Sequence, residues 1–238
     1  MLGLGANIAM SDRLFSLNDI SDLSLYLKNG VGVTAAQWDD SSGNANHATQ
    51  ATAGDQAVVT RGGLNFELDE EDHYDLGSEI TIATNQGFTL FVVVQLESIG
   101  ANATILAKAS SAHFFEFMAG GDNIRIRLGG GASANAVIQP DTTGLFAADA
   151  KFLLTVVRQS GGTGAIDAYK DGEELVQDAQ VANPGDAEYS IVGARNSAES
   201  EDRFLDGIIY ELAFYEKQLS ALEIADAHSY LLDKHKIV

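Results

Sequence analysis

The segment FTLFVVVQL, residues Phe88–Leu96, decides the fold class of this chain. It is rich in β-branched and aromatic residues, has the length of one strand, and shows no alternation of polar and apolar positions. A strand with this pattern is buried on both faces, as an inner strand of a β-sandwich can be. The segment therefore predicts a central strand that is covered on each side by other parts of the protein.

Further strand patterns follow along the chain. Residues 123–128 (NIRIRL) alternate, so that Ile124, Ile126 and Leu128 face inwards and the two arginines face outwards. Asp171-Gly172 separates two short strand patterns, and Asp-Gly supports the positive φ angles of a type I′ hairpin turn. Three more strand patterns occupy residues 152–157, 189–192 and Gly207–Tyr215. Many strands at regular spacing with glycine-rich turns predict an antiparallel sandwich or jelly roll.

One helix is predicted near the C-terminal end. Ser220 and Glu223 form a capping box, in which each side chain accepts a hydrogen bond from the other residue's amide. The residues that follow place Ile224, Ala227, His228 and Leu231 on one face of the helix. This face should pack on the domain. No proline-rich or serine-rich linker divides the chain. We therefore predict an N-terminal arm, residues 1–18, and one jelly-roll domain, residues 19–238.

The composition excludes several classes of function. Cysteine is absent, so that disulfides, thiolate metal sites and thiol catalysis are ruled out. The 14 basic and 34 acidic residues give a net charge of −20, which argues against nucleic acid and anionic membranes as partners. This charge suits cationic or neutral partners, or partners bridged by divalent cations. The longest apolar run is far shorter than the roughly 20 residues that a membrane helix needs.

The two ends of the chain resemble those of laminin-G/concanavalin A-like jelly-roll domains. Residues 23–27 (LSLYL) followed by residues 37–50 (QWDDSSGNANHATQ) are similar to the opening motif of this family. Residues 204–211 (FLDGIIYE) and 229–232 (SYLL) are similar to its closing motif, and residues 168–172 (AYKDG) resemble its hairpin.

The resemblance extends over roughly residues 20–237 and implies an all-β, antiparallel jelly-roll β-sandwich of the concanavalin A-like type with a short C-terminal α-helix. This fold hosts lectins, glycosidases, adhesion modules and virion proteins, so that it does not by itself imply a function. The lack of cysteine, the high glycine and alanine content and the acidic charge resemble those of bacteriophage virion proteins.

The leading hypothesis is a non-enzymatic structural or adhesion module of a phage virion, as a capsid decoration, fibre or tail component. Its expected location is the virion or an extracellular surface. The expected partners are other virion or surface proteins, which the domain contacts through its N-terminal arm. A homo-oligomer is also expected. One alternative is a lectin-like carbohydrate-binding module, with or without calcium. A more remote alternative is a glycoside hydrolase that uses Glu67 and Glu71.

The hydrolase alternative comes from an acidic segment, residues 67–75, which has six carboxylates in nine residues. Glu67, Asp69 and Glu71 spell E-x-D-x-E, the pattern that sets the nucleophile and the acid on one strand face in related laminarinase-type glycosidases. On a strand these side chains would share a face, and a retaining enzyme needs two carboxyl groups about 5–5.5 Å apart. However, Glu70 would then face the core, where an unpaired carboxylate is very costly. A solvated acidic loop and a cation site are the other two interpretations.

Oxygen-rich loops are the candidate calcium sites, because Ca²⁺ takes six to eight oxygen ligands. Three such loops lie around residues 39–46, 69–75 and 199–206. The predicted calcium ligands are Asp39, Asp40, Asn44, Asp69, Asp72 and Asp206. For the first loop, the alternative is that Asn and Gly adopt left-handed turns and the side chains tie the loop to itself. No catalytic residue and no cofactor other than this calcium is predicted, since zinc-enzyme histidine spacing and G-x-S-x-G are missing.

Overall fold

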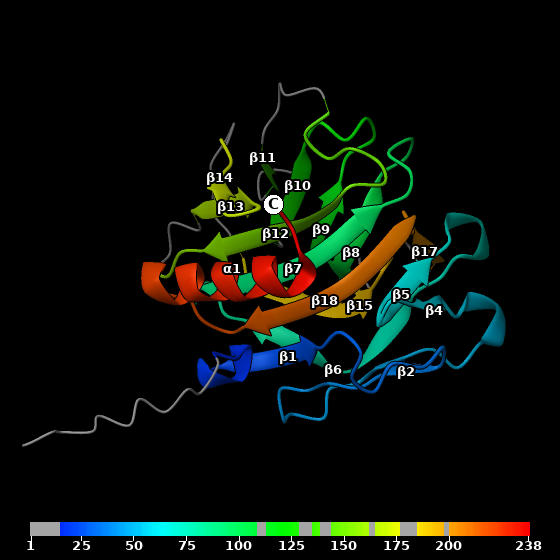
Figure 1. Ribbon diagram of the computed structural model, residues 1–238, viewed down its shortest axis with the longest axis horizontal. Helices are drawn as coiled ribbons and strands as arrows, with labels where there is room; N and C mark the ends of the chain where they lie inside the picture. Colours follow the sequence, from blue (N-terminus) through cyan, green and yellow to red (C-terminus); the bar gives the residue numbers. More distant parts are fainter. Residues whose placement is uncertain are drawn as a thin grey trace, which may run out of the picture.

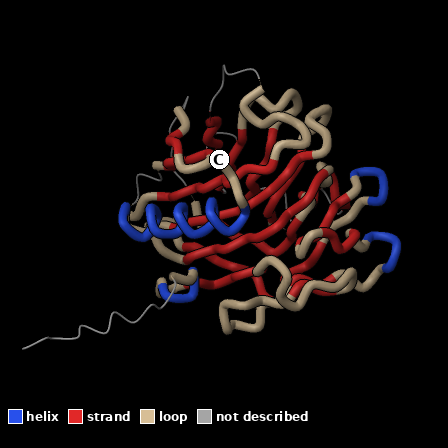
Figure 2. The backbone as a smooth tube through the Cα atoms, in the orientation of Figure 1, coloured by secondary structure: helices blue, strands red, loops and turns tan. Residues whose placement is uncertain are grey.

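The computed structural model describes residues 15–108, 113–128, 135–138, 144–161, 165–176, 185–197 and 200–238. Two antiparallel β-sheets stack face to face, and one α-helix lies on the outer face of the first sheet (Figures 1 and 2). The predicted all-β jelly-roll sandwich with a C-terminal helix is therefore confirmed. None of the described helices is long and apolar enough to cross a membrane.

The first sheet, sheet A, carries the helix. In spatial order its strands are β14 (Glu173–Glu174), β13 (Ile166–Lys170), β12 (Lys151–Arg158), β7 (Phe88–Leu96), β18 (Gly207–Tyr215), β5 (Gly63–Phe66) and β4 (Val58–Thr60), and β1 (Leu23–Leu27) also pairs with β18. The strand predicted as central, β7, lies between β12 and β18 and is antiparallel to both.

The second sheet, sheet B, lies against the inner face of sheet A. In spatial order its strands are β11 (Asn135–Ile138), β10 (Ile124–Leu128), β9 (His113–Phe117), β8 (Ala103–Ala107), β15 (Ala187–Val192), β6 (Tyr74–Ile82), β3 (Ala48–Thr49) and β2 (Gln37–Trp38). The remaining described elements are the hairpin β16 (Arg195–Ser197) and β17 (Ser200–Asp202), the 3₁₀ turns η1 (Leu17–Asp19), η2 (Ala53–Asp55) and η3 (Leu68–Glu70), and α1 (Ala221–His235).

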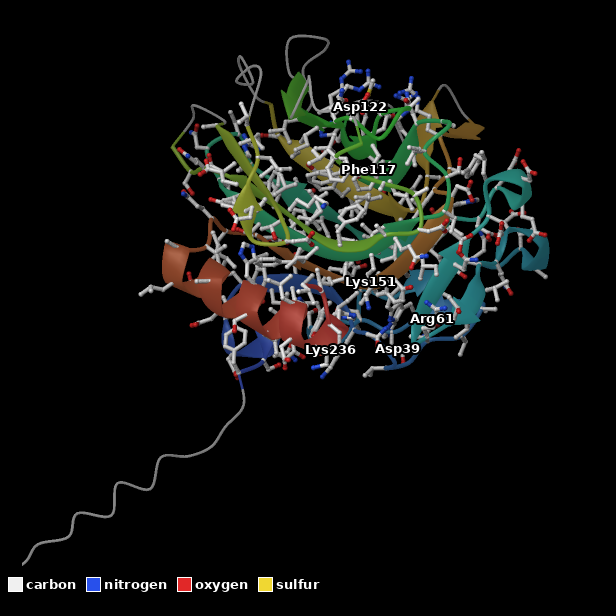
Figure 3. All side chains as sticks on the ribbon, turned by 45° about the horizontal axis from the view of Figure 1, so that its top comes forward. Asp39, Arg61, Phe117, Asp122, Lys151 and Lys236 are labelled. Atoms are coloured by element: carbon white, nitrogen blue, oxygen red, sulfur yellow. The ribbon has the colours of Figure 1, made fainter. Side chains whose placement is uncertain are left out.

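The core lies between the two sheets, where side chains fill the space around the labelled Phe117 in Figure 3. Phe88 of β7 packs edge-to-face on Phe115 and Tyr189 of sheet B and stacks on Phe214. The other face of β7 places Phe91 in a second apolar cluster beneath α1. Both faces of this strand are thus buried, which confirms the prediction made from its lack of alternation.

The local signals for the hairpin and the helix are also confirmed. Asp171 and Gly172, between β13 and β14, have φ angles of 53° and 88°, as a type I′ turn requires. At the start of α1, the Ser220 amide donates to the Glu223 carboxylate at 2.7 Å and the Glu223 amide donates to the Ser220 hydroxyl at 3.3 Å. The capping box therefore fixes the first turn of the helix.

The start of the described chain packs on the same outer face as the helix. Leu17 of η1 is fully buried in the apolar cluster beneath α1, and its carbonyl accepts a hydrogen bond from the Tyr215 hydroxyl at 2.7 Å. Of the predicted arm, residues 1–18, the first 14 lie outside the described residues. The boundary between arm and domain stays a prediction.

Candidate functional site

The acidic segment does not continue as a strand. Strand β5 ends at Phe66, and η3 (Leu68–Glu70) follows at once, with Glu71 in the left-handed conformation at φ 60°. Leu68 packs on a small apolar cluster, and the buried Asp72 carboxylate accepts a hydrogen bond from the Glu67 amide at 2.8 Å. The expectation that Glu67, Asp69 and Glu71 share a strand face is therefore wrong, because this packing and hydrogen bond favour a tight turn.

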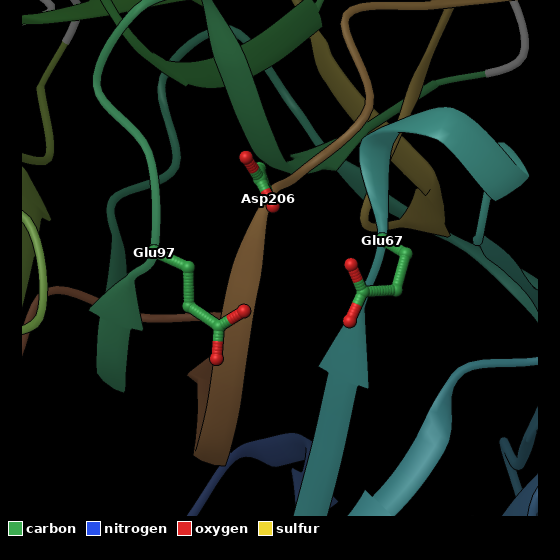
Figure 4. A group of neighbouring side chains, drawn as sticks. All are labelled: Glu67, Glu97 and Asp206. Atoms are coloured by element: carbon green, nitrogen blue, oxygen red, sulfur yellow. The ribbon is translucent and has the colours of Figure 1, made fainter.

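Three acidic side chains from distant parts of the sequence do meet at one end of sheet A (Figure 4). Gly207 of β18 pairs with Phe66 on one side and with Leu96 on the other. The next residue of each strand end, which is Glu67, Glu97 or Asp206, therefore falls into one row across three strands. Each contributes a carboxylate oxygen, and these oxygens all lie within 4.8 Å of one another.

We call Glu67, Glu97 and Asp206 the acidic row. Their negative charges repel one another. Burial, and then the neighbouring charges of Glu97 and Asp206, raise the pKa of Glu67. Burial, and then Asp69, raise the pKa of Asp206. Three carboxylates could supply part of the six to eight oxygens that Ca²⁺ takes. The sequence prediction included Asp206 and missed Glu97, because only the register of β7 against β18 reveals that they are neighbours.

Replacing Glu67 by glutamine is expected to stabilise the domain by roughly 0.2–1 kcal/mol, because a like charge leaves the row. The amide oxygen of glutamine still accepts the hydrogen bond that Asn65 Nδ2 gives to Glu67 Oε1 at 3.0 Å. Thermal unfolding at neutral pH should show a rise in Tm of about 1–4 °C. The exposed Glu174→Gln serves as the control and should leave Tm unchanged. A lower Tm for Glu67→Gln would contradict the repulsion.

The loop around residues 39–46 is held by its own side chains. Asp40 is nearly buried, and its two oxygens accept hydrogen bonds from the Tyr26 amide, the Ser42 amide and hydroxyl, and the Asn46 amide, at 2.7–3.0 Å. These four bonds use the acceptor capacity of a carboxylate. The structure therefore uses Asp40 to hold the loop, and calcium binding by this residue stays a prediction that competes with these four bonds.

The amides of this loop tie it to other strands. Asn44 Nδ2 donates to the Leu23 carbonyl at 2.9 Å, and Asn46 exchanges two hydrogen bonds with the backbone of Ser78 in β6. The self-tied interpretation therefore holds for Asp40 and Ser42, which accept hydrogen bonds from residues of the same loop, whereas Asn46 ties the loop to β6. The left-handed positions, however, are Gly43 and Ala45 rather than an asparagine.

The six predicted calcium ligands do not form one site. Asp39, Asp40 and Asn44 lie in the loop just described, Asp69 and Asp72 lie around η3, and Asp206 lies in the acidic row. Within the described part of the chain, Asp206 is the member that joins a group of three acidic residues with closely spaced oxygens. Glu199 and the side chains of Glu201 and Asp202 lie outside the described residues.

A polar groove of about 460 Å³ runs between β1 of sheet A and β6 of sheet B. Its polar lining includes Asp22, Asn44, Ser78, Glu79 and Glu216. Burial, and then the charge of Asp22, raise the pKa of Glu216. Within the described residues, the Glu216 carboxylate and the Ser78 hydroxyl make no side-chain hydrogen bond. Sequence reasoning missed Asp22 and Glu216, because neither belongs to an acidic run.

Comparisons with known proteins bear on the whole fold. The family model for the concanavalin A-like lectin/glucanases superfamily matches residues 68–225. No curated protein matches the chain. Among solved structures, a Trypanosoma rangeli sialidase mutant displaying trans-sialidase activity has a TM-score of 0.56 at 17% identity, covering 87% of this chain and 32% of the sialidase.

Two toxin structures have the same fold. The binding domain of Paraclostridial Mosquitocidal Protein 1 gives a TM-score of 0.60 at 16% identity, covering 90% of this chain and 53% of the other. The second is botulinum neurotoxin type C, whose cell entry depends on interaction with two ganglioside molecules. It gives a TM-score of 0.53 at 13% identity, covering 90% of this chain and 52% of the neurotoxin chain. This chain therefore spans between about a third and about half of these structures. The family match, over more than half of the sequence, shows that the chain belongs to the concanavalin A-like lectin/glucanase superfamily.

Proposed function

We propose that this domain is a non-catalytic carbohydrate-binding module and that the groove between β1 and β6 takes hydroxyl groups of a sugar. The observation that carries the proposal is the excess of hydrogen-bond acceptors in the groove. Within the described residues, the Glu216 carboxylate has no side-chain partner; Asp22 accepts from the Ser21 hydroxyl at 2.8 Å and lies 3.9 Å from Lys217 Nζ, and Glu79 lies 3.4 Å from Lys108. The Glu216 carboxylate, and the acceptor positions that Asp22 and Glu79 have left, can therefore accept hydrogen bonds from a ligand.

Sugars supply such donors. Neighbouring hydroxyl groups can each donate to one carboxylate, and hydrogen bonds to a charged acceptor contribute about 1.5–3 kcal/mol. Leu23 and Ile80 add apolar surface to the same groove, against which the C–H face of a sugar ring can pack. The volume of about 460 Å³ falls within the roughly 300–1,000 Å³ of small-molecule sites.

The structural relatives support this class of ligand. One of them depends on interaction with ganglioside molecules for cell entry, and another is a sialidase in complex with sialic acid. Each statement concerns the relative itself. It supports a glycan, rather than a nucleic acid or a peptide, as the ligand proposed for this chain.

Replacing Glu216 by glutamine is expected to weaken binding of the best-bound glycan by about tenfold, because a charged acceptor becomes a neutral one. A glycan array would select the ligand, and isothermal titration calorimetry would measure the change in Kd. Asp226→Asn on the exposed face of α1 has the same charge change and should leave Kd unaltered. An array without any bound glycan, both with calcium and with EDTA, would remove the proposal.

The proposal leaves out hydrolysis. The Glu67 carboxylate lies beside Glu97 and Asp206 rather than in a strand-face pair with Glu71. If purified protein hydrolysed a β-glucan and Glu67→Gln abolished that activity, the domain would instead be a glycosidase.

A place in a phage virion, anchoring by residues 1–18 and homo-oligomerisation are compatible with glycan binding and remain proposals. They rest on composition and on a segment whose first 14 residues lie outside the described part of the chain. Mass spectrometry of purified particles, together with the oligomeric state in solution, would test them. A monomer that is absent from particles would count against them.

A further inference from the structure

Arginine side chains gather on the outer face of sheet B. The chain has seven arginines and a net charge of −20. Four of these arginines, Arg125, Arg127, Arg195 and Arg203, surround two side chains of β9, and we call this group the arginine cluster. Figure 3 shows nitrogen-bearing side chains gathered near the labelled Asp122, in the turn between β9 and β10.

The register of β9 and β10 builds the centre of this cluster. Arg125 lies opposite Glu116, and Arg127 lies opposite Phe114. The guanidinium groups of Arg125 and Arg195 lie 5.1 Å and 5.3 Å from the centre of the Phe114 ring, which is almost fully buried beneath them. Cation–π contact with this ring therefore holds two cations in fixed positions.

One buried carboxylate serves these cations. Arg125 Nη2 donates to Glu116 Oε1 at 2.5 Å, and Arg203 Nη1 lies 2.7 Å from both oxygens of Glu116. Arg195 Nη1 lies 3.8 Å from Glu116 Oε2. Three of the four guanidinium groups, those of Arg125, Arg195 and Arg203, thus lie around the Glu116 carboxylate. The hairpin β16–β17 also carries Glu201 and Asp202, whose side chains lie outside the described residues.

Arg127 is the arginine of this cluster whose hydrogen-bond donors are least used by the described residues. It makes no ion pair in the described part of the chain, and its Nε is buried without a hydrogen-bond partner, as is the Nε of Arg125. A buried donor without a partner costs about 1–3 kcal/mol. The side chains of Arg125 and Arg203 are 23% and 30% exposed, so that a ligand from solvent can reach the cluster.

We propose that the arginine cluster binds the sulfate or carboxylate groups of acidic glycans. Guanidinium groups bind both groups through paired hydrogen bonds, whereas the carboxylate-lined groove between β1 and β6 would repel them. A nucleic acid needs an extended basic surface, and this cluster is a single small patch on a strongly acidic protein. The inference adds a second site to the proposed glycan-binding function and does not depend on the groove.

Binding of defined polymers tests the proposal. Dextran sulfate and polygalacturonate supply the sulfate and carboxylate forms, unsulfated dextran is the neutral control, and polyuridylate is the nucleic acid control. In low salt, wild-type protein should bind one or both acidic glycans and neither control. Arg127→Gln should weaken this binding about tenfold. Arg127→Lys keeps the positive charge but loses the paired hydrogen-bond donors of the guanidinium group, and it should weaken binding less.

Matched variants separate this site from general charge and from the groove. Lys236→Gln removes one exposed positive charge elsewhere and should leave binding unchanged. Glu216→Gln should also leave it unchanged, so that failure of the groove and failure of the cluster are distinguished. Thermal unfolding checks that each variant is folded. Absence of binding to either acidic glycan, equal binding of polyuridylate, or equal losses in Lys236→Gln and Arg127→Gln would overturn the proposal.

Discussion

Replacing Glu211 by leucine is expected to destabilise the domain by about 3–5 kcal/mol, with a fall in Tm of roughly 10 °C. Glu211 lies in β18 beneath α1 and is almost fully buried. Its carboxylate accepts hydrogen bonds from the Tyr26 hydroxyl at 2.5 Å, Lys234 Nζ at 2.8 Å and His235 Nε2 at 2.6 Å. Removal of the carboxylate leaves the buried donors of Tyr26 and His235, and the partly exposed Lys234, without this acceptor and loosens the last turn of the helix.

The same carboxylate makes stability depend on pH. Burial alone would raise the pKa of Glu211, but the hydrogen bonds from His235 and Lys234 outweigh burial and hold this pKa below its ordinary range. Its contribution is therefore complete above the unfolded-state pKa of about 4.3 and is lost as the pH falls through the lower folded-state value. The difference in unfolding free energy between wild type and Glu211→Leu should shrink over this acid range.

Chemical denaturation at a series of pH values from about 3 to about 7 measures this difference directly. Glu174→Leu in the exposed β14 is the matched control and should change the unfolding free energy by less than about 0.5 kcal/mol. A Glu211→Leu variant as stable as wild type at neutral pH would show that the buried network contributes nothing net. A difference that stays constant as the pH falls would contradict the role of the ionised carboxylate.

Replacing Asp40 by alanine is expected to destabilise the domain by about 3 kcal/mol, because four hydrogen bonds to one charged group are lost together. Three of the donors are backbone amides, those of Tyr26, Ser42 and Asn46, and the first belongs to β1. The loop then loses one of its attachments to sheet A, and the groove formed partly by Asn44 and Asn46 loses its shape. Unfolding free energy and glycan affinity should therefore both fall.

Calcium discriminates between the two roles considered for Asp40. Since its oxygens are already used, the loss of stability should be the same in calcium and in EDTA. The neighbouring Asp39→Ala is the control: its side chain is 45% exposed, and its replacement should cost less than about 1 kcal/mol. If calcium raised the Tm of wild type and not that of Asp40→Ala, the loop would be a cation site after all.

Signals that depend on near neighbours in the sequence predicted their structures well. The uninterrupted apolar run of β7, the Asp171-Gly172 turn and the Ser220–Glu223 capping box each form as expected. In each case the free energy that selects the conformation comes from the segment itself or from burial of its apolar faces. The same segments, with the two terminal motifs, led to the correct superfamily.

The acidic segment shows where this reasoning fails. The alternation of Glu67, Asp69 and Glu71 fits a strand, yet the buried Asp72 carboxylate and the packing of Leu68 produce a turn. Neither contact is visible in the local pattern, because the cluster that receives Leu68 comes from β15 and from residues near 204. Tertiary packing therefore overrode the local preference.

The sequence by itself thus determined the sandwich, its terminal helix and its tight turns, because these follow from burial and from hydrogen bonds between near neighbours. Only the tertiary structure decided which charged groups meet: the acidic row at the end of sheet A, the acceptors of the groove, the network around Glu211 and the arginine cluster. The physical reason is that antiparallel register joins residues more than 100 positions apart, such as Glu97 and Asp206, and no local preference encodes that pairing.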